Sequence, residues 1–317
     1  LLKDHHPEGI AVAFDRPEPT FRHEMIGDYK AGRAEAPDIL RQQLGLVRQV
    51  VETLHIPLLE LAGYEADDII ATLATQARDR GDDVVIVTGD RDAYQLVEDP
   101  HVKVLYNRRG VSDYVLYDEA GIRERTGVWP RDYPIYAALR GDPSDNLPGV
   151  PGVGEKTAAK LVNDYGDLDG IFAHLDACTP KLRENLAAAE AQVRQNAKAT
   201  PLIRDVPVEC DVDDLRMGGF DAEGDAAFDQ EVRKLFAFLE FRTLWDRLVD
   251  ALGAPALSGA ATPDASGVAP LEVEVTRARD DVAAAAAADA LAGAGGALAA
   301  AGEWRGGEGR SPLAGIA

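Results

Sequence analysis

The chain has 317 residues, of which 46% are hydrophobic, so it can bury a sizeable core and is not expected to be disordered as a whole. Its 33 Lys and Arg against 55 Asp and Glu give a net charge of −22. This balance argues against a non-specific nucleic-acid coat, but it leaves room for a nuclease with a local basic patch. No apolar run approaches the ~20 residues of a membrane span, and two cysteines cannot form a disulfide scaffold. We expect a reduced cytoplasmic setting and no membrane partner.

The first 250 residues alternate apolar strand-like runs with amphipathic helical segments. A strand is expected over residues 9–14, and helices are expected over 40–54 and 66–80. Gly81 ends the second helix, and the runs DVVIVTG and KVLY predict two further strands. This alternation predicts an α/β domain over residues 1–132, with a mostly parallel central sheet and flanking helices. Residues 133–250 are mainly helical in pattern and predict a second, helical subdomain.

The last 67 residues differ in composition, because Ala and Gly fill 34 of their positions. Residues 251–270 are typical of a linker. Beyond them, LEVEV predicts a short strand and DDVAAAAAADALAGA a helix. We therefore expect residues 271–317 to be the start of a further, truncated domain.

Acidic residues gather at four places where a predicted strand ends or a helix or turn begins. Ligands of open α/β sheets bind beyond the carboxyl ends of strands, so acids that follow two strands can share one crevice. Two further groups lie at the start of the helix over 66–80 and in the turn RGDPSDN. The eight carboxylates are Asp15, Glu65, Asp67, Asp68, Asp90, Asp92, Asp142 and Asp145.

Each acidic group also has a purely structural explanation. Acids at a helix N-terminus act as caps, which would account for Asp67 and Asp68, and Asp15 after a strand is an ordinary turn former. The joint pattern favours metal binding, because so many carboxylates would repel one another unless cations neutralised them. Oxygen ligands without His or Cys fit Mg²⁺ or Mn²⁺. Two such ions ~4 Å apart form a common arrangement for phosphodiester cleavage.

A glycine-rich turn stands in LPGVPGVGEKTAAKLV, residues 147–162. Glycines there allow backbone N–H groups to approach a phosphate, and the following helix N-terminus favours an anion. The pattern is typical of a helix-hairpin-helix motif, which holds the DNA backbone without reading its sequence. A plain helix–helix turn is the alternative. The candidate DNA-binding residues here are Gly149, Gly152, Gly154, Lys156 and Lys160.

Residues 20–37 carry bases soon after Asp15 in the chain. A cation from Arg22, Lys30 or Arg33 could hold a scissile phosphate or its leaving oxygen. Tyr29 could stack on a terminal base. A solvated surface helix explains the segment equally well.

The blocks GYEADDIIATLA, VTGDRDAYQL and LRGDPSDNLPGVPGVGEKTAAKL resemble the 5′–3′ exonuclease domains of bacterial DNA polymerase I, in the flap endonuclease family. The resemblance runs from about Glu8 to Leu248. Residues 271–317 resemble the start of the exonuclease-like domain that follows in those enzymes, and we expect it to be truncated here. It implies primer removal and repair at the nucleoid in the cytoplasm, on DNA with 5′ ends or flaps, and a polymerase domain in the full-length chain.

The resemblance also implies residue roles. The first of two Mg²⁺ (or Mn²⁺) ions would belong to Asp15, Glu65 and Asp67, and the second to Asp90, Asp92, Asp142 and Asp145, with Asp68 alongside. Lys30 and Arg33 match bases that contact the scissile phosphate. The turn from Gly149 to Gly154 matches a duplex-binding hairpin assisted by a monovalent cation, which we expect to be K⁺.

The sequence departs from the family's pattern at its start. Family members open with an apolar strand that ends in Val-Asp-Gly, and that Asp is a further metal ligand. No such segment stands here, so we expect an α/β domain that lacks its first strand. A DNA-binding fragment with impaired catalysis is therefore the alternative to an active nuclease. A phosphatase or nucleotide-binding domain would need a nucleophile loop or a glycine fingerprint after the first strand, and GVPGVG follows no strand.

Overall fold

The computed structural model describes residues 2–33, 37–109, 113–216 and 226–252, together with two short strands near the C-terminus. The chain divides into two units, Leu1–Ala260 and Ala261–Ala317. In the second unit the described strands are β6 (Gly302–Trp304) and β7 (Leu313–Ile316), an antiparallel pair. The strand and helix expected over 271–294 lie outside the described residues. None of the described helices is long and apolar enough to cross a membrane.

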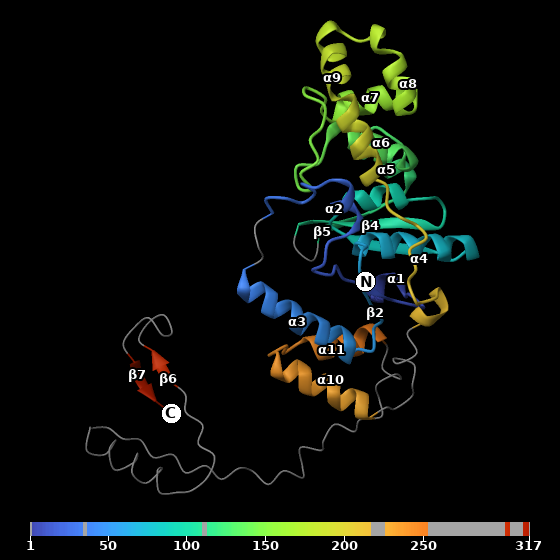
Figure 1. Cartoon of the computed structure of the whole chain (residues 1–317). Helices are drawn as coiled ribbons and strands as arrows, with labels where there is room; N and C mark the ends of the chain where they lie inside the picture. Colours follow the sequence, from blue (N-terminus) through green and yellow to red (C-terminus); the bar gives the residue numbers. More distant parts are fainter. Residues whose placement is uncertain are drawn as a thin grey trace, which may run out of the picture. The chain divides into compact units, whose positions relative to one another are not determined.

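The strands of the first unit form two sheets (Figure 1). In one, β1 (Val12–Ala13) and β2 (Leu58–Leu59) run parallel. In the other, β3 (Val84–Thr88) and β4 (Val102–Arg109) are parallel and β5 (Asp113–Tyr117) joins antiparallel. The α/β class is confirmed, but the described strands are divided and mixed in direction. The strands β2 and β5 were not expected from the sequence.

The helix α4 (Ala66–Arg80) shows how local sequence sets the element that carries the acids. Glu65 caps its N-terminus through a capping box, and Gly81 ends it in the left-handed conformation with φ of 86°. Ile69, Leu73 and Ala77 form its buried face. The acids of its first turn favour the positive end of the helix dipole. This end of α4 is therefore fixed in place, and it faces the end of β1.

The other helices of the first unit fall into three groups. The N-terminal part carries α1 (Leu2–His5), α2 (Phe21–Met25), α3 (Asp38–Thr53), α5 (Glu119–Thr126) and the 3₁₀ turns η1 (Asp92–Leu96) and η2 (Pro130–Asp132). The helical part holds α6 (Tyr133–Arg140), α7 (Glu155–Tyr165), α8 (Leu168–Ala173), η3 (Leu175–Ala177) and α9 (Pro180–Ala199). The last group is η4 (Val212–Leu215), α10 (Ala226–Phe238) and α11 (Leu244–Leu252).

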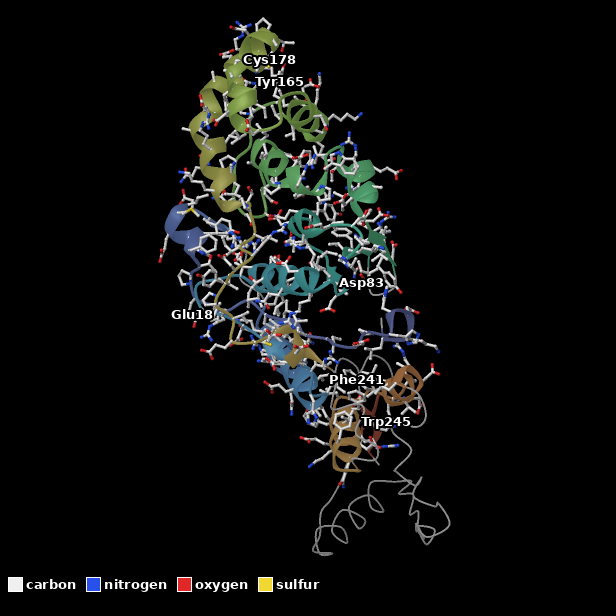
Figure 2. All side chains as sticks on the ribbon, turned by 90° about the vertical axis from the view of Figure 1, so that its right-hand side faces the viewer. Glu18, Asp83, Tyr165, Cys178, Phe241 and Trp245 are labelled. Carbon is white, nitrogen blue, oxygen red and sulfur yellow. The ribbon has the colours of Figure 1, made fainter. Side chains whose placement is uncertain are left out.

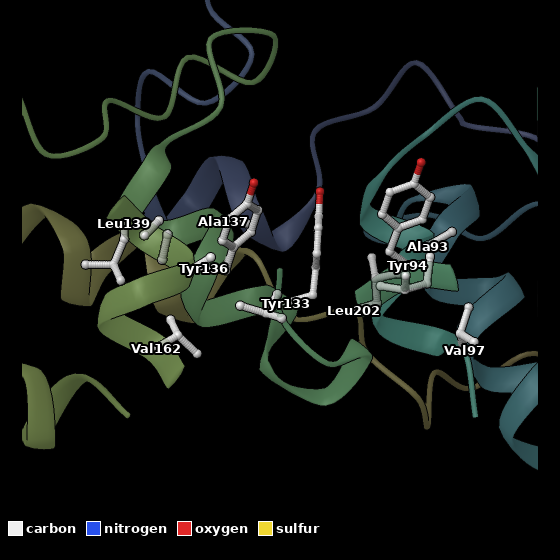
Figure 3. Close-up of a cluster of buried hydrophobic side chains, with 14 of the residues drawn as sticks. Ala93, Tyr94, Val97, Tyr133, Tyr136, Ala137, Leu139, Val162 and Leu202 are labelled. Atoms are coloured by element: carbon white, nitrogen blue, oxygen red, sulfur yellow. The ribbon is translucent and has the colours of Figure 1, made fainter. Parts of the chain in front are cut away.

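One hydrophobic core joins the sheet to the helical part (Figure 3). It includes Val104 of β4, Tyr94 of η1, Leu139 of α6 and Leu186 of α9, none more than 1% exposed. Burial of a Leu side chain contributes about 1.5–3 kcal/mol. Because the core is continuous, the acids at the sheet edge and the hairpin before α7 are held in one packed body.

The helices α10 and α11 pack on α3 instead of on the helical part. Phe228, Val232 and Phe236 of α10 form a small core with Leu248, and Val50 of α3 packs against it. Figure 2 shows Phe241 and Trp245 at this end of the unit, far from Tyr165 and Cys178 of the helical part. Residues 226–252 thus belong with the α/β part in space. The sequence pattern could not indicate this, because it shows an apolar helix face but not its partner.

Candidate active site

The start of α4 lies against the end of β1 through a hydrogen bond from backbone to carboxylate. Ala66 N donates to Asp15 Oδ1 at 2.8 Å. Glu65 N donates to Asp68 Oδ2 at 3.1 Å, which closes the capping box. Asp15 therefore lies beside the first turn of α4, which carries Glu65 and Asp67, and two of the four acidic groups meet.

The turn after β3 holds the third acidic group. Asp90 N donates to Thr88 Oγ1 at 3.0 Å, and Asp92 N donates to Asp90 Oδ1 at 2.8 Å. Asp90 is exposed, whereas Asp92 begins η1 and is half-buried. These two hydrogen bonds hold the Asp90 carboxylate in place and keep the turn compact.

The fourth group lies in the loop between α6 and α7. Asp142 Oδ1 accepts from Ser144 N at 2.8 Å and from Ser144 Oγ at 2.6 Å. Asp142 and Leu147 exchange two backbone hydrogen bonds of 2.8 Å each. The loop is thus closed at its base, and Asp145 lies within it with a mostly covered side chain.

The segment after α2 ties two of these groups together. The Tyr29 hydroxyl lies 2.7 Å from Asp145 Oδ2 and 3.3 Å from Glu65 Oε2. Lys30 Nζ donates to Glu65 Oε1 and Arg33 Nη2 donates to Asp145 Oδ1, both at 2.5 Å. One hydroxyl and two cations therefore hold carboxylates from α4 and from the α6–α7 loop in one cluster.

The electrostatics of Asp67 reveal how closely the groups approach. Burial, reinforced by the negative charges of Asp90, Asp15 and Glu65, raises the pKa of Asp67 to about 7. The charge of Lys30 opposes this shift. Carboxylates of three segments thus raise the free energy of ionising one Asp.

The pKa of Asp92 is raised by the same two effects, burial and neighbouring carboxylates. Burial raises its pKa well above the ordinary value, and the charges of Asp90, Asp142, Asp145 and Asp67 act in the same direction. Within the described part of the chain, no three His, Cys, Asp or Glu side chains already stand in a metal-binding arrangement. The donor set itself is nevertheless that of a hard divalent cation, since it consists of carboxylate oxygens. The excess negative charge that raises both pKa values is what a cation would neutralise.

Three residues predicted to meet DNA or metal lie inside the protein. Arg22 is 2% exposed and pairs with Asp68, which is fully buried. Tyr29 is 4% exposed, and its hydroxyl contacts carboxylates. These positions correct the expectation that Arg22 and Tyr29 contact DNA directly, because neither can reach the surface. They also leave Asp68 paired with an internal guanidinium and turned away from any surface ligand.

The hairpin glycines differ from one another. A Cβ on Gly149 would lie 2.0 Å from the Arg140 carbonyl oxygen, so this glycine is required for close backbone packing and not for access of a phosphate. Gly152 has φ of +79°, and Gly154 caps α7 with no atom within 4 Å of an added Cβ. The structure thus corrects the role of Gly149, while Gly154 stays accessible.

The two hairpin lysines are exposed on α7. Lys160 forms an ion pair with Asp164, one turn further along the helix. Lys156 lies in the first turn of α7, beside the accessible Gly154. The N-terminus of this helix, its exposed glycine and Lys156 form the surface where a phosphate could be held.

Two arginines that the sequence analysis did not single out connect the acids with the hairpin. Arg91 Nη1 lies 3.2 Å and Arg140 Nη1 3.8 Å from Glu155 Oε1, the first residue of α7. Arg140 Nη2 also lies 3.9 Å from Asp142 Oδ2. The position of Arg91 between Asp90 and Asp92 was the one sequence signal for this link.

The fold agrees with that of solved 5′ nucleases. The 5′-exonuclease of bacteriophage T5 with bound zinc superposes with a TM-score of 0.56 and 23% identity, over 74% of this chain and 86% of that one. A complex of the T5 flap endonuclease with DNA and metal ions gives 0.54 and 22%, over 75% and 86%. At these identities the likeness concerns the fold, and it defines the class as a 5′ nuclease fold.

Sequence comparison then gives the family. Residues 1–127 match the model described as 5′–3′ exonuclease, N-terminal resolvase-like domain, and residues 128–223 match 5′–3′ exonuclease, C-terminal SAM fold. DNA polymerase I of Mycobacterium bovis is 47% identical over 254 residues, and that of Bacillus caldotenax is 40% identical over 249. The chain belongs to the 5′–3′ exonuclease family found in bacterial DNA polymerase I.

The match covers most of this chain but a minor part of those relatives. It includes 80% of this chain and 27% of the Mycobacterium bovis protein, and 78% and 28% for Bacillus caldotenax. The chain therefore spans about a quarter of the length of these curated relatives.

Proposed function

We propose that this chain hydrolyses DNA phosphodiesters as a divalent-metal-dependent 5′–3′ exonuclease and 5′-flap endonuclease. In this proposal it removes primers and flaps in replication and repair at the nucleoid in the cytoplasm, within a longer chain that carries a polymerase domain. The observation that carries the proposal is the convergence of carboxylates from β1, α4, the β3–η1 turn and the α6–α7 loop.

The cluster offers oxygen ligands in two groups. Asp15, Glu65 and Asp67 would hold one Mg²⁺ or Mn²⁺ ion. The second group, Asp90, Asp92, Asp142 and Asp145, would hold another. When bound, such ions supply a hydroxide-forming water site and a positive charge for the phosphate oxygens.

The protein's own residues position the substrate around these groups. Lys30 and Arg33 emerge beside Glu65 and Asp145, where each can place a cation near a phosphate that approaches the carboxylates. We assign the duplex to the hairpin, with Gly152, Gly154, Lys156 and Lys160 contacting its backbone. A K⁺ ion at this turn belongs to the proposal through the family resemblance.

The test is cleavage of a 5′-labelled flap duplex with Mg²⁺, with Mn²⁺ and with EDTA. Asp90→Asn keeps the size of the side chain and its acceptor oxygen for Asp92 N, but removes a ligand charge. We expect cleavage to fall by about 100-fold or more while duplex affinity is retained. Asp82→Asn, at an exposed acid between α4 and β3, is the matched control.

Two results would contradict the proposal. Cleavage that continues undiminished in EDTA would exclude a divalent-metal mechanism. Full activity of Asp90→Asn would show that the second carboxylate group is not needed for cleavage. Tight binding of the flap without any cleavage by the unaltered chain would instead favour the DNA-binding alternative.

A further inference from the structure

A buried ion pair lies directly behind the acidic cluster. Arg22 Nη1 and Nη2 donate to Asp68 Oδ2 and Oδ1 at 2.6 and 2.8 Å, and the two side chains are 2% and 0% exposed. Asp68 Oδ1 also accepts from Ile203 N at 2.9 Å, and Oδ2 accepts from Glu65 N. Arg22 Nε donates to Ala199 O at 2.9 Å. Both charged groups are thus enclosed and extensively hydrogen-bonded.

The pair connects three segments that are distant in sequence. Arg22 belongs to α2, Asp68 to the first turn of α4, and Ala199 to the end of α9 in the helical part. Arg22 Nη2 also donates to Pro201 O at 3.2 Å, so the chain that returns from α9 is hydrogen-bonded to both members of the pair. The pair therefore joins the acidic end of α4 to the helical part.

The same return segment is fastened to the hairpin loop and to η1. Asn196, which is fully buried, donates to Ala138 O and to Pro148 O, at 3.2 and 2.9 Å. Gln95 donates to Thr200 O at 3.0 Å, and its Oε1 accepts from Leu202 N at 2.9 Å. A shift of Arg22 or Asp68 would thus be transmitted both to α4 and to the loop that carries Asp142 and Asp145.

Stability alone is a weak reason for this arrangement. Enclosing two charges costs free energy. Burial acts to lower the pKa of Arg22, but the hydrogen bonds and the charge of Asp68 outweigh burial, and the pKa of Arg22 is raised. Apolar side chains of similar volume often stabilise a core as well as a buried ion pair does. A bidentate pair with fixed geometry, in contrast, specifies one arrangement of the segments it joins.

We propose that Arg22 and Asp68 are positioning residues of the nuclease. The pair fixes the first turn of α4, and so holds Glu65 and Asp67 in register with the carboxylates of the α6–α7 loop. Neither residue touches substrate. The inference rests on the proposed function, because it concerns how the carboxylates come to hold a divalent cation.

The test replaces the pair by apolar groups in the double variant Arg22→Met/Asp68→Leu. Tm by circular dichroism, the Kd for Mn²⁺ by calorimetry, the Kd for duplex and the single-turnover cleavage rate are measured. We expect the double variant to fold with a lowered Tm, because Ile203 N, Glu65 N, Ala199 O and Pro201 O lose their side-chain partners. The duplex Kd should stay within about threefold, but Mn²⁺ affinity and cleavage should be about 10–100-fold lower. Loss of geometry without loss of fold would account for this combination.

A second variant and a control keep the test decisive. Arg22→Lys retains the charge but not the fork of donors, and it should lower Mn²⁺ affinity and cleavage in the same direction. Arg78→Met breaks the ion pair of Arg78 with Glu98 at the other end of α4, and should leave Mn²⁺ affinity unchanged. If the double variant fails to fold, Arg22→Lys decides.

The outcomes separate this inference from the proposed function. A folded double variant, or a folded Arg22→Lys, with undiminished Mn²⁺ affinity and cleavage would overturn the positioning role while the nuclease function stands. If the unaltered chain binds no Mn²⁺ and does not cleave, the proposed function fails, and this inference fails with it. If it binds Mn²⁺ without cleaving, weaker Mn²⁺ binding by the variants still supports the positioning role.

Discussion

Three hairpin glycines are expected to respond to alanine in three different ways, because their surroundings differ. A Cβ on Gly149 would lie 2.0 Å from Arg140 O and 2.3 Å from its carbonyl carbon. Ordinary contacts need more than 3 Å, so the backbone would have to move by about 1 Å, at a cost of ~3 kcal/mol or more. At ~2–4 °C per kcal/mol, Gly149→Ala should lower Tm by about 6–12 °C. It should also displace Asp142 and slow cleavage.

Gly152 and Gly154 have room for a Cβ. Gly152 has φ of +79° and one ordinary contact, at 3.6 Å from Asn185 Nδ2, so Gly152→Ala should cost ~1–2 kcal/mol through backbone conformation alone. Gly154 has ordinary φ and no neighbour within 4 Å, and Gly154→Ala should cost at most ~1 kcal/mol as a poorer helix cap. If a phosphate binds at the start of α7, the duplex affinity of Gly154→Ala should nevertheless fall by about 10-fold.

The assays are thermal unfolding by circular dichroism and duplex binding by fluorescence anisotropy. Gly45→Ala is the matched control, since Gly45 lies within α3 with no neighbour near its Cβ. It should stabilise the helix by ~0.5–1 kcal/mol and leave duplex affinity unchanged. An unchanged Tm for Gly149→Ala would refute the close packing at Arg140. Duplex affinity equal to that of the unaltered chain in Gly154→Ala would refute phosphate binding at this helix end.

Two further substitutions probe the charge cluster and the shared core. The pKa of Asp67 is about 7 in the folded chain and ~3.9 in the unfolded chain. Between these two values the folded state holds a proton on Asp67 that the unfolded state has lost. The resulting stabilisation is full below pH 4 and is lost as the pH rises through 7. In EDTA the free energy of unfolding should therefore fall by ~1–2 kcal/mol between pH 5 and 8, allowing for solvent screening. Asp67→Asn should abolish that fall. An equally steep fall in Asp67→Asn would contradict the raised pKa of Asp67. Leu186→Ala, at a side chain with no exposed surface, should lower the free energy of unfolding by ~2–5 kcal/mol in urea. Lys181→Ala, at an exposed side chain, should lower it by under ~0.5 kcal/mol. Equal costs would argue against the core that joins the sheet to the helical part.

The sequence by itself determined the elements whose signals are local. The helix over 66–80 was predicted with the bounds that the structure has, because its cap, its apolar face and the terminating Gly81 all lie within one stretch of chain. The strands after Arg80 were also recognisable from β-branched runs, and the acids at their ends from adjacency alone. The strands β2 and β5 were missed, because two apolar residues, or five beside a turn, carry little signal until a partner strand is present.

Only the tertiary structure decided which charged residues face inward. Arg22 meets Asp68 46 positions away and Ala199 177 positions away, so no local pattern distinguishes it from the neighbouring surface bases. Tyr29 was expected to stack on DNA, yet it lies between carboxylates from two other segments. Gly149 looked like the accessible glycines beside it, but it packs against the backbone of Arg140. Residue type and spacing fix what a side chain can bind, whereas long-range packing fixes whether solvent, a ligand or another part of the chain is its partner.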